Sequence, residues 1–380
     1  MRRAFAGFAL FVVLFPYPAF ALDLRGQIDP LVRNALNTSP AVGVVVGIYK
    51  NGETQVLGYG EVDKGSGVRP DGDTVYEIGS ITKTFTGILI AGQVLRGQMK
   101  LEAPVQEYLP ATVVLPIVPG GPVTVRHLVT HTGGFPHRPD NLNPPDPANP
   151  YANYSSEALF AYLEGYRPRH PLGTYSYSNL GMGLAGFLVQ RQTGQTYAEL
   201  IADRITGPLG MHDTSTVPSP AMVARLAPPY SGKLHKIKSW DYAPTLAGAG
   251  GIRSTVNDLL KYTRAQLAPD ASPLGRAIGL SHERQGTRDH GKPIAVAWRV
   301  SANGQVFTHG GRTAGYRAWI AVVPSRQMGV VLLANGSAFK VVSLGEKVFE
   351  AALRNLKDAS EGPVPMVDTE ESTSDEESNE

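Results

Sequence analysis

The sequence predicts an α/β protein of the α+β kind, in which helices flank one antiparallel sheet built from both ends of the chain. Strand patterns cluster at residues 44–62 and 294–334, and the apolar spacing between about 79 and 267 is mostly helical. A sheet made from the first and last segments, with a helical region inserted between them, forms one unit whose crevice lies where the two parts meet. We therefore expect the ends of the folded body to lie close together.

The first strands form a hairpin. Val44–Tyr49 is rich in β-branched residues, Asn51-Gly52 is a strong two-residue turn, and Thr54–Val62 resumes an extended pattern. In the inserted region, Phe85–Leu95 and Leu180–Leu188 have helical character. A capping pattern, Thr255-x-x-Asp258, predicts the start of another helix.

The sheet is completed near the other end of the chain. A second hairpin is predicted from two strand-like segments, Ile294–Val300 and Val306–Thr308, with the turn Asn303-Gly304 between them. Two further strands and one helix follow, at Tyr316–Val323, Met328–Ala334 and Val341–Leu356.

The composition is that of a folded globular protein. Of 380 residues, 42% are hydrophobic and 18% charged, which excludes a disordered or fibrous chain. The formal net charge is only +2, but the last 23 residues hold nine acids and no Lys or Arg, so the body from 22 to 357 is markedly basic. A basic body favours anionic partners, whether a small carboxylate substrate, anionic lipid or nucleic acid. No basic run is interleaved with aromatic residues, so we expect no nucleic acid partner.

The first 21 residues predict a secretory signal peptide. Arg2 and Arg3 precede an apolar stretch, Ala4–Phe15, and a small-residue exit ends at Ala21. An uncleaved anchor is the alternative, but this stretch is shorter than the ~20 residues of a membrane span. We expect cleavage after Ala21, no stable membrane span, and a periplasmic or secreted protein.

Residues 22–357 are then expected to form the folded domain, with the helical insertion at about 79–267. Residues 358–380 predict an acidic disordered tail, because their charged and small residues cannot bury enough apolar surface. The chain has no cysteine, so no disulfide framework supports the fold.

The first candidate catalytic residues are Ser80 and Lys83. Three residues along a helix bring two side chains to one face, so an amine at 83 can reach the hydroxyl at 80. The helix N-terminus adds positive potential there. The same pattern recurs at Ser337 and Lys340, so it is weak evidence alone.

Tyr177-Ser178-Asn179 supplies a second candidate, because a phenol beside an ammonium loses its proton more readily. Tyr177 is therefore a candidate general base, and the Asn179 amide can hold a substrate carbonyl and Lys83. A second copy, Tyr151-Ala152-Asn153, lies in a Pro/Asn-rich loop, and we interpret Tyr151 as an exposed loop residue.

The third candidate is His309-Gly310-Gly311-Arg312, between the predicted strands 306–308 and 316–323. The two glycines let a substrate backbone approach the strand edge. The backbone N–H groups of Arg312 and Ser80 form a candidate oxyanion-binding pair, and His309 lines the same wall.

These three segments, in this order, resemble the serine β-lactamase and penicillin-binding protein superfamily, in the branch of class C β-lactamases and DD-peptidases. Tyr76–Thr86 is similar to the nucleophile segment of that family, and so are the segments Leu128–Gly134, Gly207–Met211 and Gly250–Thr255. The resemblance covers nearly all of the mature body and implies a β-lactamase/transpeptidase-like fold. It implies catalytic roles for Ser80, Lys83 and Tyr177, and substrate-binding roles for Asn179, His309, Gly310, Gly311 and Arg312. The copy at Ser337 has no such segments after it.

Two departures from the class C pattern bear on the substrate. His309-Gly310-Gly311 stands where class C enzymes usually have Lys-Thr-Gly, and the histidine form is more typical of DD-peptidases, esterases and amidases. Arg138 falls near a position where class C enzymes tend to have a substrate-binding glutamine. The resemblance therefore implies acyl transfer to Ser80 but leaves the side-chain pocket open.

We rank DD-carboxypeptidase or endopeptidase activity on D-Ala-D-Ala peptides first, β-lactamase second, and esterase or D-amino-acid amidase third. A penicillin-binding sensor without turnover is a non-enzyme alternative. Four residues are candidates for the positive field around a substrate carboxylate: Arg312, Arg317, Arg138 and His309.

Two other hydrolase classes do not fit. No serine has the Gly-x-Ser-x-Gly context of an α/β-hydrolase. His127 and His131 lack the glutamate and third ligand of a zinc hydrolase, and we interpret them as a helix-surface and a structural loop residue. We expect neither a metal nor a cofactor, and the oligomeric state is not predicted.

Overall fold

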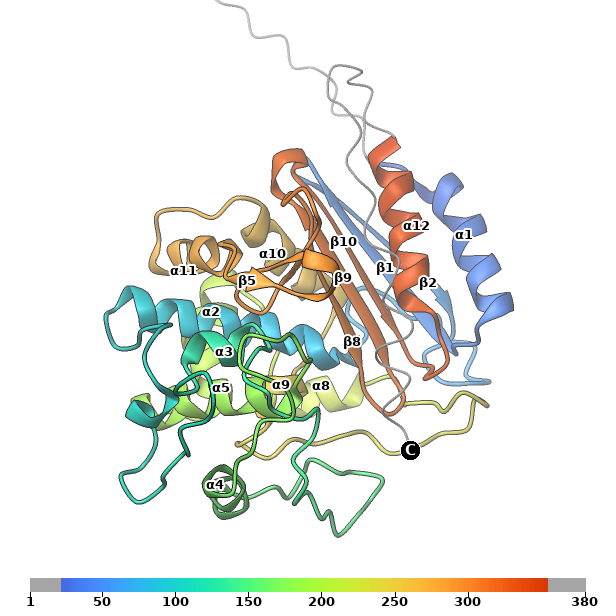
Figure 1. The fold of residues 1–380 in the computed structure, drawn as a ribbon. Coiled ribbons are helices and arrows are strands. Elements are labelled where there is room, and N and C mark those ends of the chain that lie inside the picture. Colours follow the sequence, from blue (N-terminus) through green and yellow to red (C-terminus); the bar gives the residue numbers. More distant parts are fainter. Residues whose placement is uncertain (1–21, 355–380) are drawn as a thin grey trace, which may run out of the picture.

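The computed structural model describes residues 22–354. The predicted signal peptide and acidic tail lie outside these residues. The described part is an α+β fold in which two helical layers enclose an antiparallel sheet (Figure 1), as the sequence predicts.

Within the described residues, the main sheet has eight strands in the order β2-β1-β10-β9-β8-β7-β6-β5. The strands are β1 Gly43–Lys50, β2 Glu53–Gly60, β5 Gly286–Thr287, β6 Pro293–Ile294, β7 Arg299–Val300, β8 Phe307–Arg312, β9 Arg317–Val323 and β10 Met328–Ala334. A separate pair joins β3 Tyr76–Glu77 to β4 Arg253–Ser254.

Twelve α-helices occur in residues 22–354: α1 Arg25–Thr38, α2 Thr82–Leu95, α3 Val125–Val129, α4 Ser156–Glu164, α5 Asn179–Thr193, α6 Tyr197–Ile201, α7 Gly207–Leu209, α8 Pro220–Ala224, α9 Ala247–Gly250, α10 Val256–Leu267, α11 Pro273–His282 and α12 Val341–Arg354. Short 3₁₀ turns are η1 Gly79–Ile81, η2 Val105–Tyr108, η4 Asp289–Gly291 and η5 Pro324–Arg326, and η3 Ala202–Thr206 is a π-helical turn.

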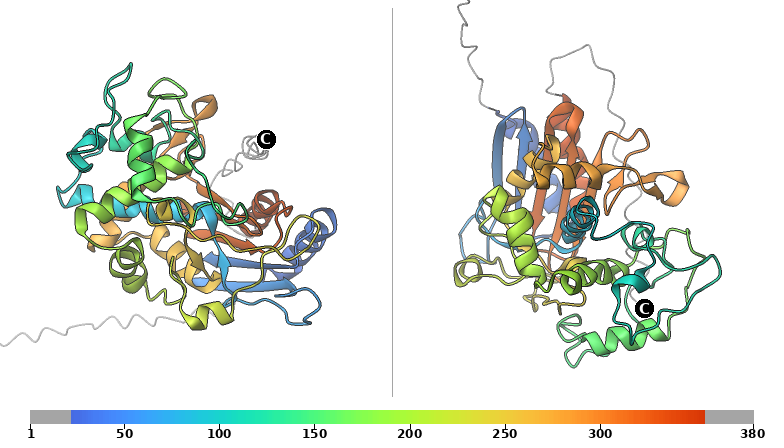
Figure 2. Two further views of the ribbon diagram at one scale, coloured as in Figure 1. Left: turned by 90° about the horizontal axis from the view of Figure 1, so that it is seen from below. Right: turned by 90° about the vertical axis from the view of Figure 1, so that its left-hand side faces the viewer.

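The two ends of the described chain share one side of the sheet. β1 pairs with β10 from Val44↔Ala334 to Lys50↔Met328, and α1 packs beside α12. Figure 2 shows these first and last elements together, with the middle of the chain on the other side. The expectation that the ends of the body lie close together is therefore confirmed.

The faces of β9 separate two hydrophobic cores. Trp319, Ala321 and Val323 pack with α1 and α12, whereas Ala318, Ile320 and Val322 face the larger core under α2, α5 and α10. This alternation is the period of two that a strand buried on both faces requires. The larger core also includes buried residues of α2, the helix that follows the candidate nucleophile and packs against α11, α5 and α9.

The first hairpin has the predicted turn. Lys50 pairs with Glu53, and both intervening residues have positive φ, 49° at Asn51 and 93° at Gly52. A two-residue turn of this type suits the right-handed twist of the strands.

The prediction of one continuous strand over Ile294–Val300 is wrong, although its last two residues form the predicted hairpin through Arg299↔Thr308 and Val300↔Phe307. The segment folds back on itself, so that Ile294 of β6 pairs with Arg299 of β7. Ala297 lies in the turn with φ 61°, and its N–H donates to the Val129 carbonyl at 3.1 Å. The fold-back carries Arg299 toward the helical insertion, where it lines a pocket described below.

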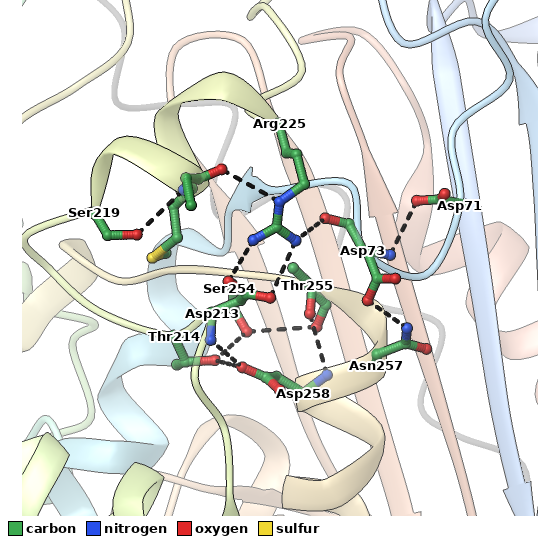
Figure 3. Close-up of polar contacts among 12 residues, drawn as sticks. Asp71, Asp73, Asp213, Thr214, Ser219, Arg225, Ser254, Thr255, Asn257 and Asp258 are labelled. Carbon is green, nitrogen blue, oxygen red and sulfur yellow. Dashed lines mark hydrogen bonds and ion pairs between the residues drawn. The ribbon is translucent and has the colours of Figure 1, made fainter.

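A polar network secures the start of α10 (Figure 3). The Thr255 hydroxyl accepts from the Asp258 N–H, which confirms the predicted cap. Asp258 accepts from the Asp213 N–H at 2.8 Å and from the Thr214 hydroxyl at 2.9 Å. Arg225 in turn forms a two-point ion pair with Asp213.

The same network reaches the loop before β3. Arg225 donates to the Asp73 carbonyl at 2.9 Å, and Asn257 donates to the Asp73 carboxylate at 2.6 Å. Thr214 bonds Ser254 of β4 at 2.8 Å. The network therefore holds the β3–β4 pair, from which the chain enters the nucleophile segment.

Candidate active site

Close backbone packing holds the two residues before Ser80. Ile78 donates its N–H to the Ile252 carbonyl beside the β3–β4 pair, and Gly79 has φ +49°. A Cβ at Gly79 would lie 2.6 Å from the backbone nitrogen of Arg312, and one at Gly311 would lie 2.1 Å from the Ile78 carbonyl oxygen. Only glycine permits this approach, so these glycines set the distance between the nucleophile segment and β8.

Lys83 joins three parts of the fold at the nucleophile. Its Nζ donates to Ser80 Oγ at 2.9 Å, to Asn179 Oδ1 at 2.7 Å and to the Ala249 carbonyl at 2.8 Å. The side chain is fully buried. An ammonium has three hydrogens, and these three acceptors use all of them. Buried and fixed in this way, the amine needs only to lose one proton to accept the Ser80 proton.

Tyr177 lies near two cations. Lys83 Nζ is 4.8 Å, and the Arg299 guanidinium carbon 5.7 Å, from the centre of its ring. Positive charge near a phenol favours its ionised form, which a general base requires.

Ser178 and His131 set the position of the Tyr177 segment. The Ser178 hydroxyl caps α5 by accepting from the Gly181 N–H at 2.9 Å, and it donates to the Pro136 carbonyl. The Ser178 N–H donates to His131 Nδ1 at 3.1 Å, and the His131 ring packs 4.5 Å from that of Tyr177. Burial, then the charge of Lys83, holds the pKa of His131 well below its usual value. His131 is thus a neutral structural residue, as interpreted from the sequence.

His127 is also structural. Its backbone and ring form a capping box with Thr124 at the start of α3, and the residue is half-buried. Within the described residues, no group of three or more His, Asp or Glu side chains is arranged to hold a metal ion.

Asn179, the first residue of α5, has a defined amide orientation. Its Oδ1 accepts from Lys83, its Nδ2 lies 3.1 Å from His137 Nε2, and its backbone N–H donates to the His137 carbonyl at 3.1 Å. The predicted proximity of Asn179 to Lys83 is therefore present.

The segment 309–312 lies inside β8 rather than after it. The predicted strand end at Thr308 is wrong, because β8 continues to Arg312 and pairs with β9 through Arg312↔Arg317. The pairing with β7 does stop at Thr308. Residues 309–312 thus lack a β7 partner on the edge that approaches the nucleophile segment.

His309 is buried and neutral. Its Nδ1 lies 2.7 Å from the Gly310 carbonyl oxygen, which places a proton on Nδ1. Burial, followed by the charges of Arg299 and Lys83, lowers the pKa of His309 to about 3. The expectation that His309 adds positive charge is therefore wrong. It lines the pocket as a polar neutral group.

Arg299 is a candidate site residue that sequence reasoning missed. It lines one pocket together with His131, Tyr175, Tyr177, Trp298 and His309. Its charge acts on both His309 and Tyr175. The sequence Ile294–Val300 resembles one strand, so it does not reveal the fold-back that brings Arg299 to the site.

The interpretation of Tyr151 from the sequence is also wrong. It is 3% exposed rather than an exposed loop residue, and it stacks on Tyr242 with 4.9 Å between ring centres. Burial raises the pKa of Tyr151, while the charge of Arg138 and hydrogen bonding to Asn179 and Arg138 lower it. Tyr151 therefore borders the site beside Asn179.

The spare serine segment has another environment. Lys340 is exposed and immediately precedes α12. Helix α12 lies on the opposite face of the sheet from α2 (Figure 1). The Ser337 N–H donates to the Tyr230 carbonyl at 2.9 Å.

Comparison with known proteins gives consistent matches. The sequence model of the Beta-lactamase family matches residues 28–353. A beta-lactamase of Pseudomonas fluorescens is 27% identical over 83% of this chain and 94% of its own length. The D-alanyl-D-alanine-carboxypeptidase/endopeptidase AmpH of Escherichia coli K12 is 26% identical over 84% of this chain and 85% of its own.

Solved structures share the fold. A beta-lactamase/D-alanine carboxypeptidase from Pseudomonas syringae superposes with a TM-score of 0.76 at 22% identity, covering 88% of this chain and 99% of its own. A class C beta-lactamase from Rhodobacter sphaeroides superposes with a TM-score of 0.75 at 24% identity, covering 87% of this chain and 99% of its own.

None of the helices in residues 22–354 combines the length and apolar character that a membrane crossing needs.

Proposed function

The chain belongs to the Beta-lactamase family, and from this premise we propose that it is an exported serine hydrolase that cleaves D-Ala-D-Ala-type cell-wall peptides through an acyl-enzyme. The observation that carries the proposal is the bonding of Lys83 Nζ to Ser80 Oγ and Asn179 Oδ1, with the Tyr177 ring 4.8 Å away. This arrangement suits activation of a serine hydroxyl.

Acylation begins when Ser80 Oγ attacks the substrate carbonyl carbon and its proton passes to Lys83 or Tyr177. The negative oxygen of the tetrahedral intermediate binds the N–H groups of Ser80 and Arg312, which the packing of Gly79 on Arg312 supports. The C–N bond then breaks, and the leaving amine takes the proton. Water attacks the Ser80 ester in the second half-reaction, which releases the acid and restores the hydroxyl.

The substrate carboxylate is assigned to the pocket of Arg299. A D-Ala-D-Ala peptide ends in a carboxylate, and Arg299 and Lys83 are the cations whose charges act on His309 in that pocket. Guanidinium groups bind carboxylates strongly. Arg299 is therefore a better candidate than His309, which is neutral.

β-Lactam hydrolysis is the second candidate function, because relatives named beta-lactamase match 83% and 88% of this chain. The two functions share acylation and differ in substrate and deacylation rate. Export rests on the predicted leader, residues 1–21, and implies a periplasmic or secreted location.

One preparation of the mature protein tests the ranking. We expect faster turnover of a D-Ala-D-Ala peptide than of a chromogenic cephalosporin, with both activities abolished in Ser80→Ala. Faster cephalosporin hydrolysis would reverse the order. Turnover of simple esters alone would favour an esterase, and labelling without turnover would favour a penicillin-binding sensor.

A further inference from the structure

His137 contacts the proposed catalytic centre through Asn179. It lies in the loop after α3, and both its backbone and its side chain bond the same asparagine. Its ring also stacks on Tyr177, with 6.0 Å between ring centres and 29° between planes. His137 thus touches two of the residues assigned to the site.

The direction of the bond between the two side chains follows from Lys83. An ammonium only donates, so the amide atom that faces Lys83 is Oδ1, and the atom that faces His137 is Nδ2, which also only donates. His137 Nε2 must therefore accept. The imidazole is neutral, and its proton is on Nδ1.

Lys83 alone cannot hold this amide orientation through acyl transfer. If it gives up a proton to act as base, its nitrogen gains a lone pair and can accept from Nδ2 of a turned amide. The turned amide would then point Oδ1 at the lone pair of His137 Nε2, which is repulsive for as long as the imidazole proton is on Nδ1. His137 therefore opposes the turned amide at the stage when Lys83 does not.

We propose that His137 is a positioning residue that keeps the Asn179 amide oriented with Oδ1 toward Lys83 throughout the reaction. This role rests on the proposed function, because it assumes that Lys83 exchanges a proton. It requires a hydrogen-bond acceptor at Nε2, and not merely a side chain of this size.

The surroundings of His137 favour the neutral acceptor form. Lys83 of α2 lies across Asn179, Tyr177 stacks on the ring, and His131 and Arg138 come from the same loop. A protonated His137 would add positive charge near Lys83 and Arg138, and it would turn Nε2 into a donor that faces another donor.

Two variants separate acceptor chemistry from packing. His137→Gln keeps an oxygen that can accept from Asn179, whereas His137→Leu has similar bulk and no acceptor. Losing one neutral hydrogen bond predicts a fall in kcat of about fivefold to tenfold for the leucine variant, with little change in KM. The glutamine variant should stay within about twofold of wild type.

Two further readouts exclude a purely structural role. Both variants should unfold at similar temperatures although their kcat values differ. The kcat ratio of His137→Gln to wild type should rise as the pH is lowered, because glutamine does not protonate. Equal kcat in the two variants would overturn the proposal.

Labelling with a fluorescent penicillin distinguishes failure of this role from failure of the proposed function. Labelling of wild type and both variants, with equal kcat, would refute the role of His137 alone. No labelling of wild type would refute the proposed function and this role with it.

Discussion

Gly79 and Arg312 are in direct backbone contact: a Cβ placed on Gly79 would lie 2.6 Å from the backbone nitrogen of Arg312 and 2.8 Å from its carbonyl oxygen. The residue before the nucleophile therefore packs on the last residue of β8. This contact packs the backbone next to Ser80 against that of Arg312, and the N–H groups of these two residues are the proposed oxyanion-binding pair.

Gly79→Ala should disrupt this contact. The added methyl group meets backbone that cannot move aside, and φ +49° is strained for alanine. We expect a loss of about 1–3 kcal/mol in the free energy of unfolding and a larger loss in the rate of Ser80 acylation. Gly97→Ala is the matched control, because Gly97 has φ +70° but nothing within 4 Å of its Cβ. Equal acylation rates in the two variants would show that the contact between Gly79 and Arg312 does not affect acylation.

Arg299→Met should weaken binding of the substrate carboxylate. Removing one charge-assisted hydrogen bond costs about 1.5–3 kcal/mol, which predicts a rise in KM of about tenfold to hundredfold for a peptide with a free C-terminus. The same peptide as a C-terminal amide should show little difference between variant and wild type. Similar KM changes for both peptides would show that Arg299 does not read the carboxylate.

Glu77 predicts an unusual pH dependence of stability. It is 3% exposed, and burial is the main cause that raises its pKa from 4.5 to about 7, although the charge of Arg253 lowers it. Between these pH values the folded state binds more protons than the unfolded state, so this group makes stability fall as the pH rises. The fall amounts to on the order of 3 kcal/mol.

Glu77→Gln should remove this component, because the amide resembles the protonated acid. Urea unfolding at about pH 5 and about pH 8 measures it. The stability of the variant relative to wild type should increase toward the higher pH by on the order of 3 kcal/mol. Parallel pH profiles would mean that Glu77 does not titrate in this range.

Asp258→Ala should destabilise the fold without changing the chemistry. Asp258 is 3% exposed and accepts from the Asp213 N–H and the Thr214 hydroxyl, which would both lose their acceptor. We expect a loss of about 2–4 kcal/mol in unfolding free energy with kcat per folded molecule unchanged. Glu283→Ala, at an exposed position, should change neither. A fall in kcat at full folding would connect the network in Figure 3 to catalysis.

Strands with strong local signals were predictable. Met328–Ala334 has the predicted bounds, and the hairpin at Asn51-Gly52 forms as expected, because β-branched runs and turn residues act locally. Helix α1 was not predicted, since it offers only Ile28 and Val32 as fully buried residues and contains Pro30. Its stability comes from packing beside α12, which no local pattern reveals.

The site residues also divide into those that local sequence predicts and those that it does not. The spacing of Ser80 and Lys83 is a local feature, and the structure has the contact that it predicts. Arg299 and Tyr151 reach the site only through a fold-back and through aromatic stacking between distant segments. Such contacts are set by tertiary packing, so a single sequence does not reveal them.

Both half-reactions of the proposed mechanism require Ser80 as the nucleophile. Mass spectrometry of the mature protein after exposure to a penicillin should find one added acyl group, and peptide mapping should locate it on Ser80. Ser337→Ala should give the same adduct and Ser80→Ala none. An adduct on another residue, or none in the wild-type protein, would contradict the account.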